Sequence, residues 1–321
     1  MAEIKSANIQ TIREIFYTEP EPHTRPGLAK KSGLSMAATE NILKGLERNG
    51  EICCKGYAPS NGGRPSKLYH LNPDHAHIGI ILLSHLDRDF TVDAACIDLG
   101  GRIVIHDILS VRNSPDTSEL ITFIKNIYEK DSLIKQLVVS FPGIVSYDGN
   151  IIDGDFPTLT GTNLKNYMSS ELSVPVHVAN DVNLAAEGYA ALHPENENLA
   201  VLYQPYTDHA GAGIIIHHQI VNGGSGFAGE VGKPAADRQM KLLNENPSLL
   251  VSLLAENIIS VAVPERIAWY APMVTDTISL PDIPEICRPV LDQMSDFNEL
   301  EEMIRTGAEA VGRKKFMRYT K

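Results

Sequence analysis

"IGIILLSHLDRDFTVDAACIDLGGRIVIHDILSV", residues 78–111, contains three apolar runs separated by short links. Runs of this length and composition predict strands over residues 78–84, 91–98 and 102–109. The link at 84–90 and the turn at 99–101 leave room only for antiparallel neighbours. The stretch therefore predicts a β-meander.

The chain after this meander alternates helical and strand patterns. Apolar residues at helical spacing predict helices over 118–131, 164–173 and 184–193, and apolar runs predict strands within 134–143 and 174–183. A second set of strands is predicted from 198–205 and 210–224. A strand meander followed by alternating helices and strands occurs twice along the chain. This repetition predicts an α/β fold with two similar lobes.

Length and composition place the chain among ordinary globular proteins. Its 321 residues are 43% hydrophobic and 21% charged, enough for two or three domains. No apolar run approaches the roughly 18–20 residues of a membrane span, and the first residues do not resemble a signal peptide. The cysteines, Cys53, Cys54, Cys96 and Cys287, show no paired spacing. We therefore expect a cytoplasmic location.

Charge divides the chain unevenly. Residues 1–72, called the head below, carry a net charge of +3, whereas residues 73–321 carry −15. A mildly basic head on an acidic body indicates that only the head approaches a polyanion.

The head carries the pattern of three short helices. Apolar residues at helical spacing precede Pro20, Pro26 lies near a second helix start, and Gly33 interrupts the chain. Ser35 is a good N-cap for a third helix. That helix has Ala38, Ile42, Leu43 and Leu46 on its inner side, and Gly50 ends it.

The second and third predicted helices form a helix-turn-helix, whose third helix enters the major groove of DNA. The residues predicted to face the groove are Met36, Ala37, Glu40, Asn41 and Lys44, with Lys30, Lys31 and Ser35 near phosphates. The alternative interpretation is a three-helix domain that binds another protein.

Residues 51–72 predict a strand, a glycine-rich loop and a second strand, which together make a wing. The loop "NGGRPSK", residues 61–67, carries Arg64 and Lys67 without acidic neighbours. We expect these cations to contact a narrow minor groove. The alternative is a solvated loop.

Four motifs resemble the ROK family, which groups repressors and sugar kinases. They are "NGGRPSK", "VVSFPGIVSYDGNII" (138–152), "HVANDVNLAAEGYA" (177–190) and "AGAGIIIHHQIVNGGSGFAGEVGK" (210–233). The resemblance implies an N-terminal winged helix-turn-helix plus a two-lobed actin-like ATPase (ribonuclease H-like) sugar-kinase fold. It implies a DNA-binding domain over 1–72, a first lobe over 73–190 and a shortened second lobe over 191–296. A C-terminal helix at about 297–318 would pack back on the first lobe.

The resemblance also raises the question of kinase activity. Kinases of this family grip phosphate with a glycine-rich loop at the end of the first strand, but here that strand ends in "LLSHLDRDF", without glycine. "IDLGGRIV", residues 97–104, falls one strand later and is interpreted as a hairpin turn. Ala271 and Pro272 stand where the family kinases have a glycine pair against adenosine. We expect no phosphoryl transfer.

A sugar site is implied by the resemblance, between the lobes. The matching positions include the loops at Pro142-Gly143 and Asp155–Thr158, and the site residues that we carry over are Gly143, Thr158, Asn180, Asp181 and Glu230. Carboxylates and amides suit vicinal hydroxyls. The alternative for Asn180-Asp181 is a strand-to-helix turn with Asp181 as the N-cap.

Two departures from the family pattern concern metal and ligand. Lys233 replaces a histidine that joins a cysteine cluster around zinc, and no cysteine lies between Cys96 and Cys287. We expect no zinc and no cofactor; His217-His218, placed on a strand, would point to opposite faces. Lys233 is a further effector-site candidate that would favour a sugar phosphate or sugar acid.

The sequence therefore predicts a sugar-responsive transcriptional repressor without enzymatic activity. Its expected partners are double-stranded operator DNA, a sugar or sugar-phosphate effector, and further copies of itself in a homodimer or higher homo-oligomer. The alternatives are an ATP-dependent sugar kinase with a DNA-binding head, and a body that only dimerises. The basic end of the last helix, "GRKKFMR", is interpreted as complementing the helix dipole.

Overall fold

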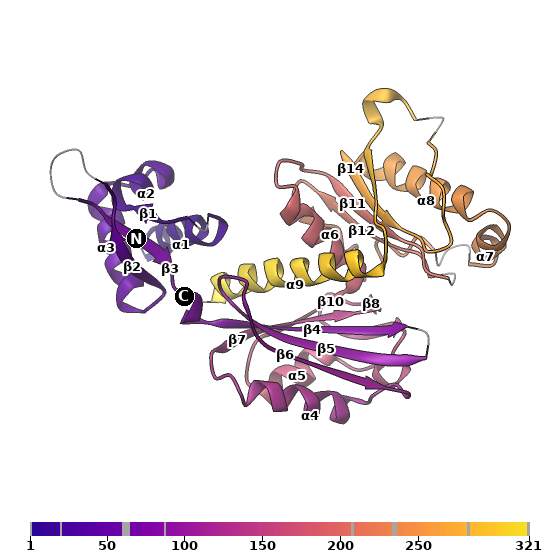
Figure 1. Ribbon diagram of the computed structural model, residues 1–321, viewed down its shortest axis with the longest axis horizontal. Coiled ribbons are helices and arrows are strands. Elements are labelled where there is room, and N and C mark those ends of the chain that lie inside the picture. The colour runs from indigo at the N-terminus through magenta and orange to yellow at the C-terminus, as the bar shows by residue number, and fades with distance from the viewer. Residues whose placement is uncertain are drawn as a thin grey trace.

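One three-stranded and two five-stranded sheets organise the chain in the computed structural model (Figure 1). The structure describes residues 2–19, 21–59, 65–86, 88–206, 209–232, 236–280 and 283–319. Arg64 and Lys233 lie outside these described residues. Within them, no helix combines the length and the apolar character that crossing a membrane requires.

The head consists of three helices and a small antiparallel sheet. Its elements are α1 (Ala2–Thr18), β1 (His23–Thr24), α2 (Arg25–Ser32), α3 (Met36–Arg48), β2 (Ile52–Tyr57) and β3 (Lys67–Leu71), with strand order β1-β3-β2. Their apolar faces close on one core, composed of Ile12, Phe16, Leu28, Leu43, Leu46, Ile52 and Tyr69. Because Gly33 adopts a left-handed conformation (φ 70°), α2 can end there and α3 can start at a new angle.

The predicted N-cap of α3 is confirmed, and its predicted inner face needs one correction. The Ser35 side chain accepts a hydrogen bond from the Ala38 amide (3.2 Å). Thr39 is fully buried, whereas Ala38 is half-buried. The Thr39 hydroxyl donates to the Ser35 carbonyl (3.1 Å), which satisfies this buried polar group.

The first five-stranded sheet has the order β10-β7-β4-β5-β6. Its strands are β4 (His77–Leu86), β5 (Asp89–Asp98), β6 (Ile103–Val111), β7 (Ile134–Phe141) and β10 (Val176–Asn180), flanked by α4 (Thr117–Tyr128) and α5 (Leu164–Leu172). β4, β5 and β6 pair antiparallel, so the predicted meander is confirmed. β7 and β10 add parallel strands, which need crossover connections.

The turn at residues 98–102 is a hairpin, as the sequence predicted. The Asp98 carboxylate accepts hydrogen bonds from the backbone amides of Gly100 (2.8 Å) and Arg102 (3.0 Å). Gly101 supplies the positive φ of 87° that the turn requires. These two amides therefore donate to Asp98 within the turn and not to a phosphate.

The second five-stranded sheet has the order β13-β12-β11-β14-β15. Its elements are β11 (Leu199–Tyr203), β12 (Gly211–Ile216), β13 (Gln219–Ile220), β14 (Arg266–Tyr270) and β15 (Val290–Gln293), with α7 (Ala236–Glu245) and α8 (Pro247–Ala262). The strand prediction for His217-His218 is wrong. Both residues have positive φ (49° and 58°) and form the tight turn between β12 and β13.

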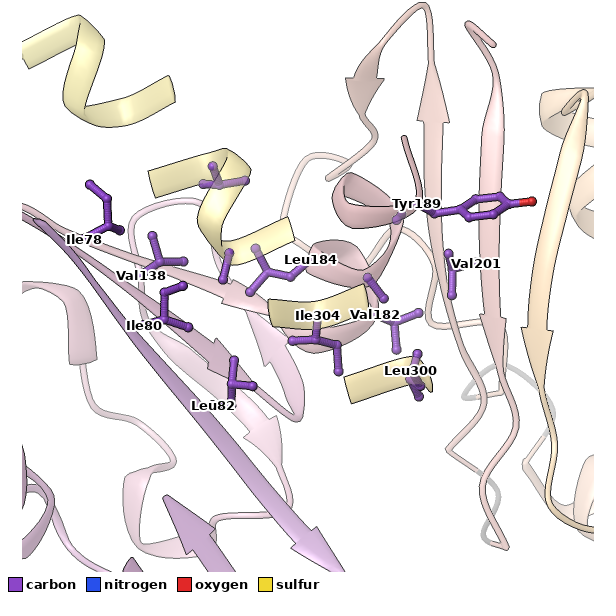
Figure 2. Close-up of a cluster of buried hydrophobic side chains, with 14 of the residues drawn as sticks. Ile78, Ile80, Leu82, Val138, Val182, Leu184, Tyr189, Val201, Leu300 and Ile304 are labelled. Carbon is purple, nitrogen blue, oxygen red and sulfur yellow. The ribbon is translucent and has the colours of Figure 1, made fainter. Parts of the chain in front are cut away.

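Two long helices connect the sheets. α9 (Phe297–Tyr319) packs on β4 and β7, α6 (Asp181–Leu192) packs on β11 and β12, and the helices pack on each other. Figure 2 shows the resulting core, with Ile78, Ile80 and Leu82 from β4, Val182 and Leu184 from α6, Leu300 and Ile304 from α9, and Val201 from β11. α9 runs from the second sheet towards the head, where its C-terminal end lies (Figure 1).

Three short 3₁₀ helices and a hairpin complete the described architecture. The 3₁₀ helices are η1 (Pro73–His75), η2 (Pro157–Leu159) and η4 (Glu285–Cys287). The hairpin pairs β8 (Gly143–Val145) with β9 (Ile151–Gly154), directly after β7. It brings the loop after β9 to the carboxyl end of the first sheet.

Candidate functional site

A polar cavity lies where the carboxyl ends of β7 and β10 face the second sheet. It has a volume of 90 Å³, and its lining includes Gly143, Asp153, Asp155, Asn180, Asp181, Tyr203, His209 and Glu230. Ligands of α/β proteins bind at such carboxyl ends. Gly143, Asn180, Asp181 and Glu230, separated by up to 87 positions along the chain, meet here.

Asn180 fixes the geometry of this cavity. Its side-chain oxygen accepts a hydrogen bond from the Asn183 amide (2.9 Å), so Asn180 is the N-cap of α6. Its side-chain nitrogen donates to the Gly143 carbonyl (2.9 Å). The alternative that Asp181 caps α6 is wrong: Asp181 is the first helical residue. Its carboxylate accepts from the Val182 amide (2.8 Å).

The cavity concentrates carboxyl groups. The pKa of Asp181 is raised to about 7, mainly by burial; the hydrogen bond from the Val182 amide lowers it, and the nearby charges of Asp155 and Glu230 raise it. A carboxyl with this pKa exchanges its proton near neutral pH. It can therefore accept or donate a hydrogen bond to a ligand hydroxyl.

Glycines allow the chain to approach closely around the cavity. A Cβ on Gly229 would lie 1.9 Å from the Ala212 carbonyl oxygen, and the φ of Gly229 is 91°. Only glycine fits there, and it places Glu230 against the start of β12. A Cβ on Gly143 would lie 2.4 Å from the Asp153 carbonyl oxygen.

Thr158 lies apart from the other candidate site residues. Its hydroxyl is exposed, donates to the Pro115 carbonyl (2.7 Å) and pairs with the Ser114 hydroxyl (2.5 Å). It is absent from the described lining of the cavity. These contacts tie η2 to the loop before α4, which is a structural role.

The opposite side of Asp181 is nearly filled. A cavity of 40 Å³ there is lined by the end of β4, including Ser84 and His85, and by Tyr203, Phe297 and Glu301. Tyr203 stacks on Tyr270 with 5.9 Å between ring centroids, and Phe297 lies 6.1 Å from Tyr203. This volume is far below the roughly 300–1,000 Å³ of typical ligand pockets.

In the head, most of the candidate DNA-contacting residues that the structure describes are exposed. Met36, Ala37, Asn41 and Lys44 are exposed on α3, and Lys30 is exposed on α2. Glu40 pairs with Arg25 and with Lys44 (2.9 Å for the latter pair). Lys31 pairs with Glu19, and Lys67 pairs with Glu47 (3.2 Å). Arg64 lies outside the described residues.

Sequence reasoning missed one buried polar group. His77, Cys96 and Asp131 place their ligand-type atoms within 4.8 Å of one another. Nδ1 of His77 lies 2.6 Å from the Asp131 carboxylate, and the Cys96 thiol donates to the same oxygen (2.8 Å). They come from the start of β4, the end of β5 and the loop before β7, and their positions carry no recognisable spacing. Sequence reasoning also missed Asp153 and His209, although "NIIDGDFP" displays the first of them.

Comparisons with known proteins agree with this architecture. Residues 93–243, which hold the described site residues, match the ROK family. The chain is 26% identical over 220 residues to a xylose repressor of Caldicellulosiruptor bescii, covering 65% of this chain and 54% of that protein. It is 23% identical over 224 residues to the xylose repressor of Bacillus subtilis, covering 67% and 57% respectively. The match thus spans little more than half the length of these relatives.

Solved structures show the same fold. A ROK family transcriptional regulator, a homologue of the E. coli MLC protein, superposes with a TM-score of 0.69 at 15% identity, covering 97% of this chain and 99% of that one. A ROK hexokinase from Thermus thermophilus has a TM-score of 0.55 at 13% identity, covering 75% and 99%. Residues 93–243 are therefore similar to the ROK family, and the chain has the fold of these solved ROK structures.

Proposed function

We propose that this protein is a sugar-responsive transcriptional repressor. Residues 1–72 form a winged helix-turn-helix that binds operator DNA, and residues 73–321 form a two-lobed sensor that binds a sugar without phosphorylating it. The observation that carries the proposal is the combination, on one chain, of an exposed α3 surface with a body that matches the ROK family over residues 93–243. The first strand of this body, β4, ends without glycine. The similarity to xylose repressors supports it.

The geometry of the head supports DNA binding. α2, the turn at Gly33 and α3 have the arrangement of a helix-turn-helix, and β2 and β3 have that of a wing. α3 presents Met36, Asn41 and Lys44 as exposed side chains. In this proposal α3 reads base edges, Lys30, Lys31 and Ser35 contact phosphates, and the wing with Arg64 and Lys67 contacts the minor groove.

The carboxyl and amide groups around Asp181 support sugar binding. Asn180, Asp181 and Glu230 offer acceptors and donors for vicinal hydroxyls, which discriminate sugars by their hydroxyl pattern. The present volume of 90 Å³ is well below the roughly 300–1,000 Å³ of ligand pockets. A sugar would therefore bind only if the surrounding loops move, and binding would select a different arrangement of the lobes.

The space beside β4 argues against phosphoryl transfer. Catalysis of this transfer requires groups that position and neutralise the phosphates. Here β4 ends without the glycine-rich loop that would approach a phosphate, and side chains of Tyr203 and Phe297 line the space beside Asp181. Ala271, directly after β14, is buried. We propose that Asp181 serves in ligand binding and not as a catalytic base.

α9 provides a physical connection between the site and the head. Asp181 begins α6, α6 packs against α9, and α9 reaches α1. Near its end, Phe316 contacts His75 edge-on, with 6.2 Å between ring centroids. Movement of the lobes would thus shift the heads of a homodimer relative to one another and change their fit to two half-sites.

The test combines DNA binding with ligand binding. Duplexes selected from a random library by the full chain are labelled, and binding is followed by fluorescence anisotropy with and without D-xylose, other sugars and sugar phosphates. We expect one sugar to change the affinity at least 10-fold and to raise the melting temperature. A ligand at about 100 times its Kd adds roughly 2.7 kcal/mol of stability.

Separate arms of the same experiment distinguish the alternatives. Turnover of MgATP with any sugar of the panel would contradict the sensor proposal and favour a kinase with a DNA-binding head. Failure to enrich any duplex would contradict DNA binding. An enriched duplex whose affinity no sugar changes would indicate a body that only dimerises.

A further inference from the structure

A second polar cavity adjoins the first at Asn180. The first, lined by the carboxyl groups around Asp181, is called the acidic site below. The second cavity has a volume of 290 Å³ and is lined by α5, β10, α6 and the end of α9, together with the turn after β8 and with β13 and the loop that follows it. Its charged and polar lining includes Lys165, His177, Asn183, Glu187, Lys314, Lys315 and Arg318. Asn180 lines both cavities, so the two sites share a wall.

The charge of this lining is opposite to that of the chain. Four cations, from Lys165, Lys314, Lys315 and Arg318, face one carboxylate, that of Glu187. The protein as a whole carries a net charge of −12. Within the described part of the chain, no carboxylate lies within ion-pair distance of any of these four side chains. Like charges in one cavity repel one another, and a bound anion would relieve that repulsion.

Burial and like charge both act on the cations. Lys315 is half-buried, and its desolvation lowers the pKa of its amine, with repulsion from Arg318, Lys165 and Lys314 adding to the effect. Burial lowers the pKa of His177 to about 4, so its imidazole is neutral at neutral pH and can donate a hydrogen bond. The basic residues near the end of α9 therefore do more than complement the helix dipole.

Asn183 adds a polar side chain to the cavity wall. The residue is 9% exposed and lines the cavity. Its backbone amide donates to the Asn180 side chain (2.9 Å), which holds Asn183 in the first turn of α6. From this position its side-chain amide can donate to an oxyanion held by the lysines.

We propose that this cavity is a second ligand site, which binds a small molecule bearing a phosphate group. A phosphate dianion matches several converging cations and offers oxygen acceptors to the Asn183 amide and the His177 imidazole. The cations come from α5 of the first lobe and from the end of α9, so the ligand would fasten α9 to that lobe. The site does not depend on the proposed function as a repressor.

Inorganic phosphate is the first probe. It is titrated into the full chain at constant ionic strength, with chloride as the reference anion, and the melting temperature is followed. We expect a saturable rise with phosphate. The pair Lys165→Gln and Lys315→Gln should weaken the apparent affinity at least 10-fold, while Lys135→Gln with Lys241→Gln, two exposed lysines elsewhere, should keep it. An equal response of both double variants, or no rise beyond chloride, would overturn the proposal.

A footprint on the unchanged chain gives an independent measurement. Brief acetylation and mass spectrometry report the accessibility of each lysine with and without ligand. Phosphate should protect Lys165, Lys314 and Lys315 and leave Lys135 and Lys241 unaffected. Protection by a duplex DNA but not by phosphate would assign the cavity to the DNA backbone and contradict a small-molecule site.

Discussion

Gly188 on α6 and Gly307 on α9 lie at the crossing of the two central helices, where the backbones touch. A Cβ on Gly188 would lie 2.0 Å from the Met303 carbonyl oxygen, and one on Gly307 would lie 1.8 Å from the Leu184 carbonyl oxygen. Side chains cannot relieve these contacts, because the neighbouring atoms are backbone. The crossing fixes the separation of the two sheets that α6 and α9 cover.

We expect Gly307→Ala to destabilise the protein, because the added methyl group must push the helices apart. Overpacking of this kind costs about 1–3 kcal/mol in the free energy of unfolding. Urea denaturation followed by circular dichroism measures it. Gly45→Ala is the control: Gly45 lies within α3 with no atom within 4 Å of a built Cβ, so alanine should leave stability unchanged or raise it by about 0.4–1 kcal/mol. An equal change in the free energy of unfolding for both substitutions would contradict the close backbone contact between α6 and α9 at Gly307.

Asp181 should make stability depend on pH. Its pKa is about 7 in the folded chain, mainly because of burial, and about 3.9 in an unfolded chain. The folded state thus binds the proton more tightly, and stability is full below about pH 4 and falls as pH rises through 7. Each pH unit in that window costs at most about 1.4 kcal/mol.

The variant Asp181→Asn isolates this effect, because the amide cannot ionise. We expect the variant to lose part of the decline in melting temperature between pH 5 and pH 8, and to melt above the unchanged protein at pH 8. Asp276→Asn, at an exposed carboxylate, should retain the full decline. If Asp181→Asn kept the same profile as Asp276→Asn, the Asp181 carboxyl would not titrate between pH 5 and pH 8, which contradicts a pKa of about 7.

The sequence predicted the local structure well, because strands and helices leave periodic patterns. The meander of β4 to β6 and the Ser35 cap follow from apolar spacing and turn chemistry. The two wrong predictions of local structure have local causes as well. His217-His218 lies inside an apolar stretch but supplies a two-residue turn, and Asn180 caps α6 where two neighbouring residues could both do so.

The acidic site was predictable only in part. Motif resemblance brought Gly143, Asn180, Asp181 and Glu230 to attention, and the structure places these residues around one cavity. Motif resemblance also suggested Thr158, but its hydroxyl donates to the Pro115 carbonyl in the loop before α4. The basic cavity was not predictable, because Lys165, His177 and Lys315 come together only when α9 packs on the first lobe.

A buried ion pair holds the first helix of the head to the start of β2. Arg13 donates to both carboxylate oxygens of Glu51, at 2.7 and 2.9 Å, and the two side chains are 11% and 3% exposed. We expect Glu51→Ala to cost about 3–5 kcal/mol, because it leaves a guanidinium buried without this partner. Thermal denaturation of the full chain measures the loss.

The exposed pair of Lys67 with Glu47 offers the matched comparison (3.2 Å). Such pairs contribute about 0–1 kcal/mol, so Glu47→Ala should change the melting temperature little. Comparable losses for both variants would show that burial does not distinguish the two pairs.

The proposed DNA contacts predict two different kinds of loss. In the proposal Lys30 lies near a phosphate. Lys30→Gln should weaken binding to all duplexes alike and reduce the slope of log Kd against log[salt] by about one, because one phosphate contact is lost. Asn41 is exposed on α3 and is placed against base edges. Asn41→Ala should cost about 1–3 kcal/mol on the selected duplex and relax specificity at one base position while leaving the salt slope unchanged. Anisotropy titrations between 50 and about 200 mM salt separate the two effects. A residue that contacts only the DNA backbone cannot change base preference. A change of base preference in Lys30→Gln, or a uniform loss of affinity for all duplexes in Asn41→Ala, would therefore contradict the proposed orientation of α3.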